Sequence, residues 1–368
     1  MPQERNPMRR PSRSGRLLVA VLAIALAGVW AIPQVRVTEN RVPPTWPTPS
    51  WAGFEDASLF RGVDNVLTDR IPTKGPVVHR TADAIVSAGL SPRADVWRGD
   101  GGTPFLSDDF TRPCAPGAGA AAGMREVDRL SARLAKADTR FLYAIVPDKS
   151  GVLRDRLGPQ ADGLMVCADR VRASWDAVDD PRVLTAWDEF ATARAAGEDL
   201  YFAGDTHWNW HGAARYSQLL LDRLATLGAA PAGLDVASEL RSTGEVEHLD
   251  DLYLIMGVQR TEPVEQLVVE RPGVTTTQEE LQLGERWSST STERTSPLIG
   301  GRTLVLRDSM FDYDGKLLAP YFADLTAVWM PDFLAQGGRM DGYDLVIIQQ
   351  VQRSSPSYLD NLVATAPE

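Results

Sequence analysis

The stretch TLVLRDS, residues 303–309, is the best guide to the fold of this chain. Its first four residues are apolar or β-branched and predict a short buried strand, which the polar residues after it end. Similar strands are predicted at 141–146, 326–329 and 345–348, and helices with apolar residues at helical spacing at 127–137, 213–227 and 316–322. Strands that alternate with helices predict an α/β domain whose parallel sheet is flanked by helices.

Ser309, at the end of this stretch, lies where an α/β domain usually places its chemistry. In an open α/β sheet, ligands bind at the carboxyl ends of the strands, and nearby backbone N–H groups can stabilise an oxyanion. A serine hydroxyl is a weak nucleophile near neutral pH unless a base takes its proton. Ser309 is therefore a candidate nucleophile, although an Asp-Ser pair after a strand also commonly forms a turn or a helix cap.

The base is predicted in the run GDTHWNWHG, residues 204–212, which holds two of the four histidines of the chain. Because a helical pattern follows this run, we expect it to form a loop that opens a helix. His207 can take the proton of Ser309, and Asp205 can orient the imidazole and stabilise its charged form. The sequence thus predicts a catalytic triad of Ser309, His207 and Asp205.

The same run also allows a zinc site. Asp205, His207 and His211 could converge on the metal, with the two histidines four residues apart. The helical zinc motif places a glutamate after the first histidine, however, and Trp208 occupies that position here. His248 has no suitable neighbour in the sequence with which to form another site. We therefore expect no metal and no other cofactor.

Four other residues near these segments are candidates for binding the substrate or an oxyanion. Trp208 could stack on a sugar ring or pack in the core, and Asn209 could stabilise an oxyanion or cap the following helix. Gln350 and Arg353, at the end of the last predicted strand, could bind sugar hydroxyls or an ester carbonyl. Arg353 could equally be a solvated residue at a strand end.

Two runs resemble segments of one known family. DTHWN at 205–209 and the strand that leads into Asp308 and Ser309 are similar to the SGNH-hydrolase-like proteins of alginate O-acetylation. Further similar segments are TDRIP at 68–72, VPDK at 146–149, DLYLIMG at 251–257, and DLVII at 344–348 with QR at 352–353. The resemblance spans about residues 55–360, and DTHWN is its most specific part. It implies an SGNH-hydrolase-like α/β fold.

This resemblance implies an extracytoplasmic enzyme that transfers acetyl groups to an exported polysaccharide through an acetyl-serine intermediate. Ser309, His207 and Asp205 match the family's triad. Arg307 stands where many members have a glycine, which alters the turn, and it is a further candidate for the oxyanion region. Anchored relatives usually act with a multi-spanning membrane acyltransferase, so such a partner is implied as the acetyl donor. The same residues also suit a carbohydrate acetylesterase or a non-catalytic glycan-binding assembly protein.

The N-terminus predicts a membrane anchor. Residues 1–16 carry five arginines and one glutamate, and residues 17–35 form a stretch without a charge that is long enough to span a bilayer. The arginines are expected to keep the N-terminus in the cytoplasm, so that a proline-rich linker at 36–53 and a domain at 54–368 lie outside. A cleaved signal peptide is the alternative. The polar residues near 258–300 predict a surface insert, either rich in strands or a long loop.

The net charge indicates whether the chain binds nucleic acid, and its cysteines indicate whether it could contain a disulfide. The net charge is −11, and since the N-terminus is basic, the remaining chain is more acidic still and is not expected to bind nucleic acid. Cys114 and Cys167 are the only cysteines. In an exported chain they could form a disulfide, or they could be two separate small side chains.

Overall fold

The computed structural model describes residues 76–281, 286–293 and 295–367, together with residues 48, 49, 59 and 62. The chain divides into two compact units, Met1–Thr81 and Ala82–Glu368, and the fold below is that of the second. The predicted N-terminal region at 1–16, the anchor at 17–35, almost all of the linker at 36–53 and the TDRIP segment lie outside the described residues. None of the helices within the described ranges is long and apolar enough to cross a membrane.

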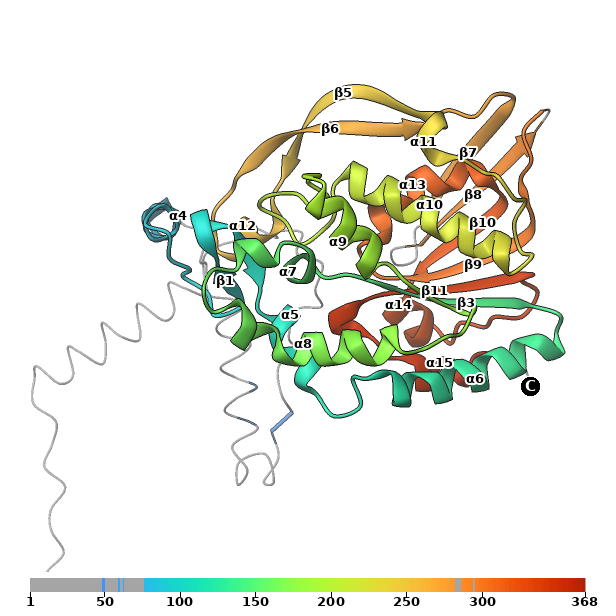
Figure 1. Ribbon diagram of the computed structural model, residues 1–368, viewed down its shortest axis with the longest axis horizontal. Helices are drawn as coiled ribbons and strands as arrows, with labels where there is room; N and C mark the ends of the chain where they lie inside the picture. The colour runs from blue at the N-terminus through green and yellow to red at the C-terminus, as the bar shows by residue number, and fades with distance from the viewer. Residues whose placement is uncertain are drawn as a thin grey trace, which may run out of the picture. The chain divides into compact units, whose positions relative to one another are not determined.

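A seven-stranded sheet forms the centre of the domain (Figure 1). From one edge to the other, its strands are β4 (Val183–Thr185), β3 (Arg140–Val146), β11 (Leu345–Val351), β9 (Ile299–Arg307), β10 (Phe322–Trp329), β8 (Arg286–Glu293) and β7 (Val274–Leu281). The first five are parallel, whereas β8 and β7 each run antiparallel to the strand before them. The sheet is therefore mixed, and the prediction of a parallel sheet is right only for the five core strands. Only four residues separate β7 from β8, too few for the crossover that parallel strands need.

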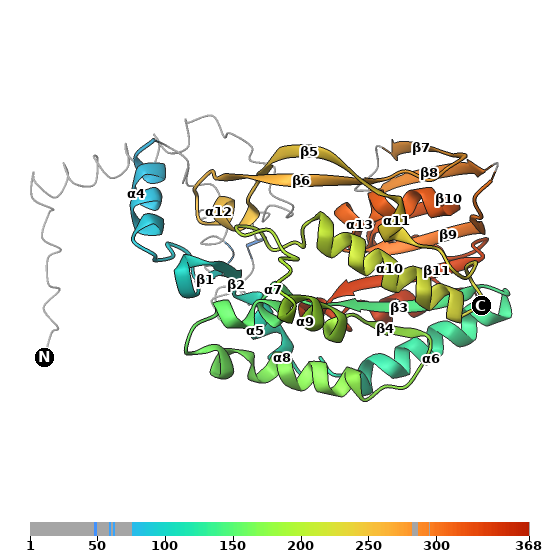
Figure 2. The ribbon, with the colours of Figure 1, turned by 45° about the horizontal axis from the view of Figure 1, so that its top comes forward.

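Helices cover both faces of the sheet, as Figure 2 shows. One face packs against α9 (Trp187–Ala195), α10 (Trp210–Thr226) and α13 (Phe311–Leu318), and the other against α6 (Ala120–Lys136), α14 (Met330–Ala335) and α15 (Leu359–Val363). Alternate residues of β3 divide between the two hydrophobic clusters, with Leu142 and Ala144 on the first face and Tyr143 and Ile145 on the second. Burial on both faces explains why the core strands read as continuous apolar runs.

A two-stranded antiparallel ribbon lies over α10 and α13, on their side away from the sheet (Figures 1 and 2). This β5–β6 ribbon consists of β5 (Leu240–Leu249) and β6 (Thr261–Val269), with α12 (Asp251–Ile255) between them. Leu267 of β6 is buried in the same hydrophobic cluster as α10. The region 258–300 thus contains β6, β7 and β8. The smaller elements are α4 (Pro76–Ser87), β1 (Val96–Arg98), β2 (Pro104–Leu106), α5 (Asp108–Thr111), α7 (Lys149–Val152), α8 (Ala161–Asp176) and α11 (Val236–Glu239).

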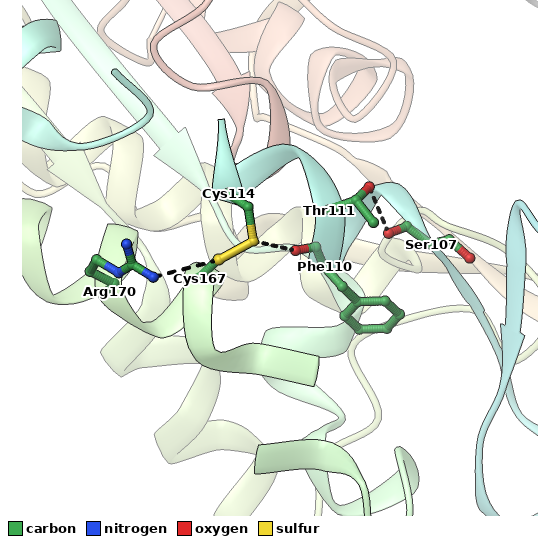
Figure 3. The surroundings of a disulfide bond; sticks show 6 residues. All are labelled: Ser107, Phe110, Thr111, Cys114, Cys167 and Arg170. Atoms are coloured by element: carbon green, nitrogen blue, oxygen red, sulfur yellow. Dashed lines mark hydrogen bonds between the residues drawn. A yellow bond between two sulfur atoms is a disulfide. The ribbon is translucent and has the colours of Figure 1, made fainter. Parts of the chain in front are cut away.

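Cys114 and Cys167 form a disulfide (Figure 3). Cys114 ends a short 3-10 helix, Arg112–Cys114, and Cys167 lies in α8. Of the two alternatives that the sequence left open, the structure shows the bonded one. The bond joins positions 53 residues apart and holds the segment that leads into α6 against α8.

Candidate active site

The carboxyl ends of three neighbouring strands carry polar residues that gather at one edge of the sheet. β3 leads into Asp148 and Lys149, β9 into Asp308 and Ser309, and β11 into Arg353. The backbone N–H of Arg353 donates to Asp148 Oδ2 over 2.8 Å, which holds the ends of β3 and β11 together. This is the edge at which α/β sheets bind ligands.

Ser309 lies half-buried in a tight turn between β9 and α13. The carboxylate of Asp308 shapes this turn, since it accepts hydrogen bonds from the N–H of Met310 at 3.1 Å and of Val351 in β11 at 2.5 Å. Burial raises the pKa of the Asp308 carboxyl, although both N–H groups and the charge of Arg353 act in the opposite direction. The turn that carries Ser309 is thus fixed to the neighbouring strand. We call residues 308–310 the Ser309 turn.

The side chain of Arg307 is buried beside the Ser309 turn. Its guanidinium pairs with Asp312 of α13 at 2.8 Å and lies 5.8 Å from the centroid of the Trp329 ring. It also donates to the carbonyl oxygen of Asp308 at 3.3 Å. These contacts stabilise the turn in which the sequence has an arginine in place of glycine, and they engage Arg307 within the protein.

His207 lies on a loop, residues 200–209, that folds back on itself between α9 and α10. The N–H of Phe202 donates to the carbonyl of His207 at 3.2 Å, and the N–H of Asn209 to that of Leu200 at 2.9 Å. Gly212 allows this fold, because a Cβ atom there would lie 2.3 Å from the carbonyl oxygen of Leu200. The loop, which we call the His207 loop, therefore presents residues 203–207 at its tip.

Asp205 and His207 form the pair that the sequence predicts. Asp205 Oδ1 accepts a hydrogen bond from the backbone N–H of His207 at 2.9 Å and lies 2.6 Å from its Nδ1. Because a carboxylate only accepts, Nδ1 carries a proton, and in the neutral ring Nε2 is the basic nitrogen. Nε2 is buried and has no hydrogen-bond partner in the part of the chain that the structure describes. This is the arrangement of a general base whose proton-accepting atom is free.

Asp205 and His207 also shift each other's pKa. Burial acts to lower the pKa of His207, but the charge and hydrogen bond of Asp205 outweigh it and raise the pKa to about 9. Burial acts to raise the pKa of Asp205, but the charge of His207 and hydrogen bonds from His207 and His248 hold it well below its usual range. Asp205 therefore stays ionised and stabilises the charged imidazolium, the form that a base takes after accepting a proton.

Trp208 joins the His207 loop to the Ser309 turn. Its indole N–H donates to the carbonyl oxygen of Met310 at 3.0 Å, and the ring of His207 lies 5.7 Å from that of Tyr313 in α13. Two segments that are far apart in the sequence are thus brought together. Trp208 is fully buried, so it packs in the core and offers no face to a sugar ring.

Asn209 and Gln350, two of the predicted binding residues, are engaged in internal hydrogen bonds. Asn209 caps α10 through its Oδ1, and its Nδ2 donates to the carbonyl of Asp199 at 2.8 Å, which is the capping alternative. Gln350 is buried, where it accepts a hydrogen bond from the Tyr143 hydroxyl at 2.9 Å and donates to the carbonyl of Ser357 at 2.6 Å. Both side chains therefore support the fold.

Arg353 is neither solvated nor an isolated cation. Its guanidinium forms salt bridges with two buried carboxylates, Asp148 and, at 3.4 Å, Asp109. Burial acts to lower the pKa of Arg353, but the charges of these carboxylates and of Asp308 raise it. The charge of Arg353 in turn acts to lower the pKa of His207. Arg353 thus contributes to the electrostatics of the site from within an ion cluster.

Three residues offer ligand atoms close enough to one another to hold a metal ion. Atoms of Asp205, His207 and Asp251 lie within 4.8 Å of one another. Apart from His207 Nε2, their ligand atoms already take part in hydrogen bonds. Asp205 bonds His207, and the two oxygens of Asp251 accept from the N–H and the hydroxyl of Thr206. His211, which the predicted zinc set requires, lies 3.0 Å from Glu265 instead. The predicted zinc set is therefore not assembled.

Sequence analysis missed two residues that hold the His207 loop. His248 was expected to lack neighbours, which is wrong, because its Nε2 lies 2.9 Å from Asp205 Oδ2. Lys149 is buried and donates to the carbonyl oxygens of Ala203 and Asp205 at 2.7 and 2.9 Å, and burial lowers its pKa to about 8. The VPDK run signals Lys149 only by resemblance, and no local pattern signals His248, which the β5–β6 ribbon brings to the loop.

Comparison with known proteins shows which family model the chain matches. The model of the SGNH hydrolase-like domain of the acetyltransferase AlgX matches residues 98–299. No curated protein matches the chain in sequence. Among solved structures, Bacillus cereus PatB1 with a sulfonyl adduct is 15% identical, with a TM-score of 0.47 over 64% of this chain and 89% of that one. The O-acetyltransferase domain of Pseudomonas putida AlgJ is 15% identical, with a TM-score of 0.43 over 74% and 99%. Pseudomonas aeruginosa AlgX is 14% identical, with a TM-score of 0.43 over 70% and 61%.

Proposed function

Because this chain belongs to the family of SGNH hydrolase-like domains of the acetyltransferase AlgX, we propose that it is an O-acetyltransferase with a Ser309–His207–Asp205 triad. It moves an acetyl group through an acetyl-serine intermediate onto an exported polysaccharide or cell-envelope glycan. The observation that supports the proposal best is the Asp205–His207 pair, whose free Nε2 lies on a loop bonded to the Ser309 turn.

In the first half-reaction, Ser309 Oγ attacks the acetyl carbonyl of the donor while His207 Nε2 takes the hydroxyl proton. Asp205 holds the imidazole in the required tautomer and stabilises its positive charge. The backbone N–H of Ser309 is the proposed donor to the oxyanion. Collapse of the tetrahedral intermediate breaks the bond to the donor's leaving group, which takes the proton from His207 and leaves an acetyl ester on Ser309.

In the second half-reaction, a sugar hydroxyl attacks the acetyl-serine and gives its proton to His207. The Ser309 oxygen leaves and recovers that proton, so the enzyme returns to its starting state with the acetyl group on the sugar. Attack by water in place of the sugar would make the chain a carbohydrate acetylesterase with the same three residues. The identity of the acceptor is therefore what separates the two activities.

We further propose that the domain acts outside the cytoplasm and is anchored by residues 17–35. The Cys114–Cys167 disulfide supports this location, since such bonds persist mainly in oxidising compartments. An acetyl donor made in the cytoplasm would then have to cross the membrane. A multi-spanning membrane acyltransferase is accordingly the proposed partner.

The test supplies the full chain in detergent with an activated acetyl ester, with and without candidate oligosaccharides. A transferase produces acetylated sugar, and mass spectrometry of a quenched reaction finds one acetyl group on Ser309. Acetate release that no sugar changes assigns the esterase activity instead. If neither product forms and a serine-directed sulfonyl fluoride does not label Ser309, a non-catalytic glycan-binding assembly role is favoured.

Two variants and a chelator serve as controls. Ser309→Ala should abolish product and labelling, whereas Ser242→Ala, at an exposed serine of β5, should behave as the parent chain. A chelator should leave the rate unchanged, because no step of the proposal uses a metal. Full turnover by Ser309→Ala would show that the assigned nucleophile is wrong.

A further inference from the structure

His248 shares the carboxylate of Asp205 with His207. Asp205 Oδ1 lies 2.6 Å from His207 Nδ1, and Asp205 Oδ2 lies 2.9 Å from His248 Nε2. Because the ionised carboxylate only accepts hydrogen bonds, Nε2 of His248 carries the hydrogen. Each oxygen of Asp205 is therefore bonded to a different histidine, which fixes the plane of the carboxylate as well as its position.

The end of the β5–β6 ribbon holds His248 in a defined orientation. The ring stacks on Phe202, with centroids 3.8 Å apart and an interplanar angle of 14°, and meets Tyr313 edge-on at 6.1 Å. His248 is the direct cross-strand partner of Glu262, and opposite residues in an antiparallel pair share one face. Glu262 Oε1 accepts a hydrogen bond from the N–H of Ala203 at 2.8 Å. The ribbon therefore contacts the His207 loop at two points.

We propose that His248 is a positioning residue for the reaction: it holds the second oxygen of Asp205 and so fixes the carboxylate that orients His207. This inference rests on the proposed function. It gives the β5–β6 ribbon a part in the activity, because the ribbon carries a side chain into the bonding network of the base. His248 itself lies in β5, before the surface insert predicted near 258–300.

Other charged or titratable groups also face this network and stay in place in the variants below. They are Lys149, Asp250, Asp251, Glu262, Asp308, Tyr313 and Arg353. Without the hydrogen bond from His248, the charge of Asp205 is less compensated and holds the proton on His207 more strongly. The pH at which His207 becomes a free base should therefore rise.

The test compares His248→Leu, which removes the donor, with His248→Gln, which keeps an N–H group. The matched control is His211→Gln, which replaces the histidine of another histidine–carboxylate contact to the same ribbon, His211 to Glu265 at 3.0 Å, but leaves Asp205 untouched. With an activated acetyl ester, His248→Leu should lower kcat by about 10- to 100-fold, the effect of losing one hydrogen bond to a charged group. It should also move the acidic limb of the pH profile upward. His248→Gln should restore much of both, and His211→Gln should change neither.

A second measurement does not depend on turnover. The chain has only four histidines, so isotope-labelled histidine gives few NMR signals, and that of His207 is assigned with His207→Gln. Its titration midpoint should rise in His248→Leu. An unmoved midpoint in folded His248→Leu, or an equal shift in His211→Gln, would overturn the proposal. If the parent chain shows neither turnover nor labelling of Ser309, the proposed function fails, and the His207 titration still decides the role of His248.

Discussion

The indole N–H of Trp208 donates a hydrogen bond to the backbone carbonyl of Met310 over 3.0 Å. Trp208 follows His207 in the sequence, and Met310 follows Ser309, so this bond joins the neighbours of the proposed base and the proposed nucleophile. A buried indole with its N–H satisfied has little freedom to move. A core contact that touches neither reacting atom thus links the segments that carry the proposed base and the proposed nucleophile.

Replacing Trp208 by Phe should separate activity from stability. The substitution keeps an aromatic ring but leaves the Met310 carbonyl without its donor, so we expect a loss of about 1–3 kcal/mol in the free energy of unfolding. Turnover of an acetyl ester should fall by at least about tenfold. A rise of about 1.4 kcal/mol in the activation free energy, caused by the misplaced base, is enough for that loss. Urea titrations and initial rates measure the two effects.

Trp175→Phe is the matched control for this prediction. Trp175 is buried against the other face of the sheet, and its indole nitrogen has no hydrogen-bond partner within the described ranges. This variant should lose stability but keep the turnover of each folded molecule. Equal turnover by both variants would refute the role assigned to the Trp208–Met310 bond.

The raised pKa of His207 predicts how activity and stability depend on pH. Because the base must be neutral, kcat/KM should rise with pH until His207 loses its proton, at a pKa of about 9. This value lies above the unfolded value of about 6.5, so the pairing with Asp205 stabilises the fold fully below that pH, and the stabilisation is lost as the pH rises through 9. Denaturant titrations from pH 6 to pH 10 should show this loss in the parent chain and less of it in Asp205→Asn. The same loss in both would contradict the assignment.

Lys149 should matter more for activity than for stability. Lys149→Met removes the two hydrogen bonds that hold the carbonyls of Ala203 and Asp205, which destabilises the His207 loop. It also removes a buried charge whose burial is unfavourable, as the lowered pKa of Lys149 shows, and this offsets part of the stability loss. We expect kcat to fall by about tenfold or more while the urea midpoint moves little. Lys136→Met, at an exposed position of α6, is the control, and equal rates for both variants would count against this role.

The disulfide should contribute stability without contributing to the chemistry. The bond joins positions 53 residues apart, and replacing both Cys114 and Cys167 by Ser should lower the free energy of unfolding by about 2–4 kcal/mol. Turnover by the folded double variant should match that of the parent chain. A reducing agent should lower the thermal midpoint of the parent chain and leave that of the double variant unchanged. A fall in turnover by the folded variant would show that the bond also supports the site.

The parts of the fold that could be predicted from the sequence are those that the core determines. β3, β9 and β11 are buried on both faces, so each carries an uninterrupted apolar run that stands out in the sequence. β7 and β5 are largely polar and carry no such run, and neither the antiparallel extension of the sheet nor the β5–β6 ribbon could be predicted. α13 begins at Phe311 and not near residue 316, because the Ser309 turn leads almost directly into it.

The candidate site could be predicted only where its residues lie together in sequence or at strand ends. Asp205 and His207 are two residues apart, and Ser309 follows a strand, so each carries a local signal. His248 reaches Asp205 from 43 residues away, and Arg353 reaches Asp109 across 244 residues. Such contacts depend on tertiary packing, which no spacing in the sequence records.

The position of β11 bears on when the chain can fold. It is the last strand in the sequence, yet it lies between β3 and β9, so the β4–β3 pair and the strands from β9 to β7 cannot join into one sheet until residues 345–351 are present. Folding that waits for contacts between distant parts of a chain is slow, and the polypeptide remains open during most of its synthesis. Chains that end before residue 345 should therefore be cleaved by proteases at sites along their whole length. A delay of this kind would favour the export across a membrane that we propose for this domain.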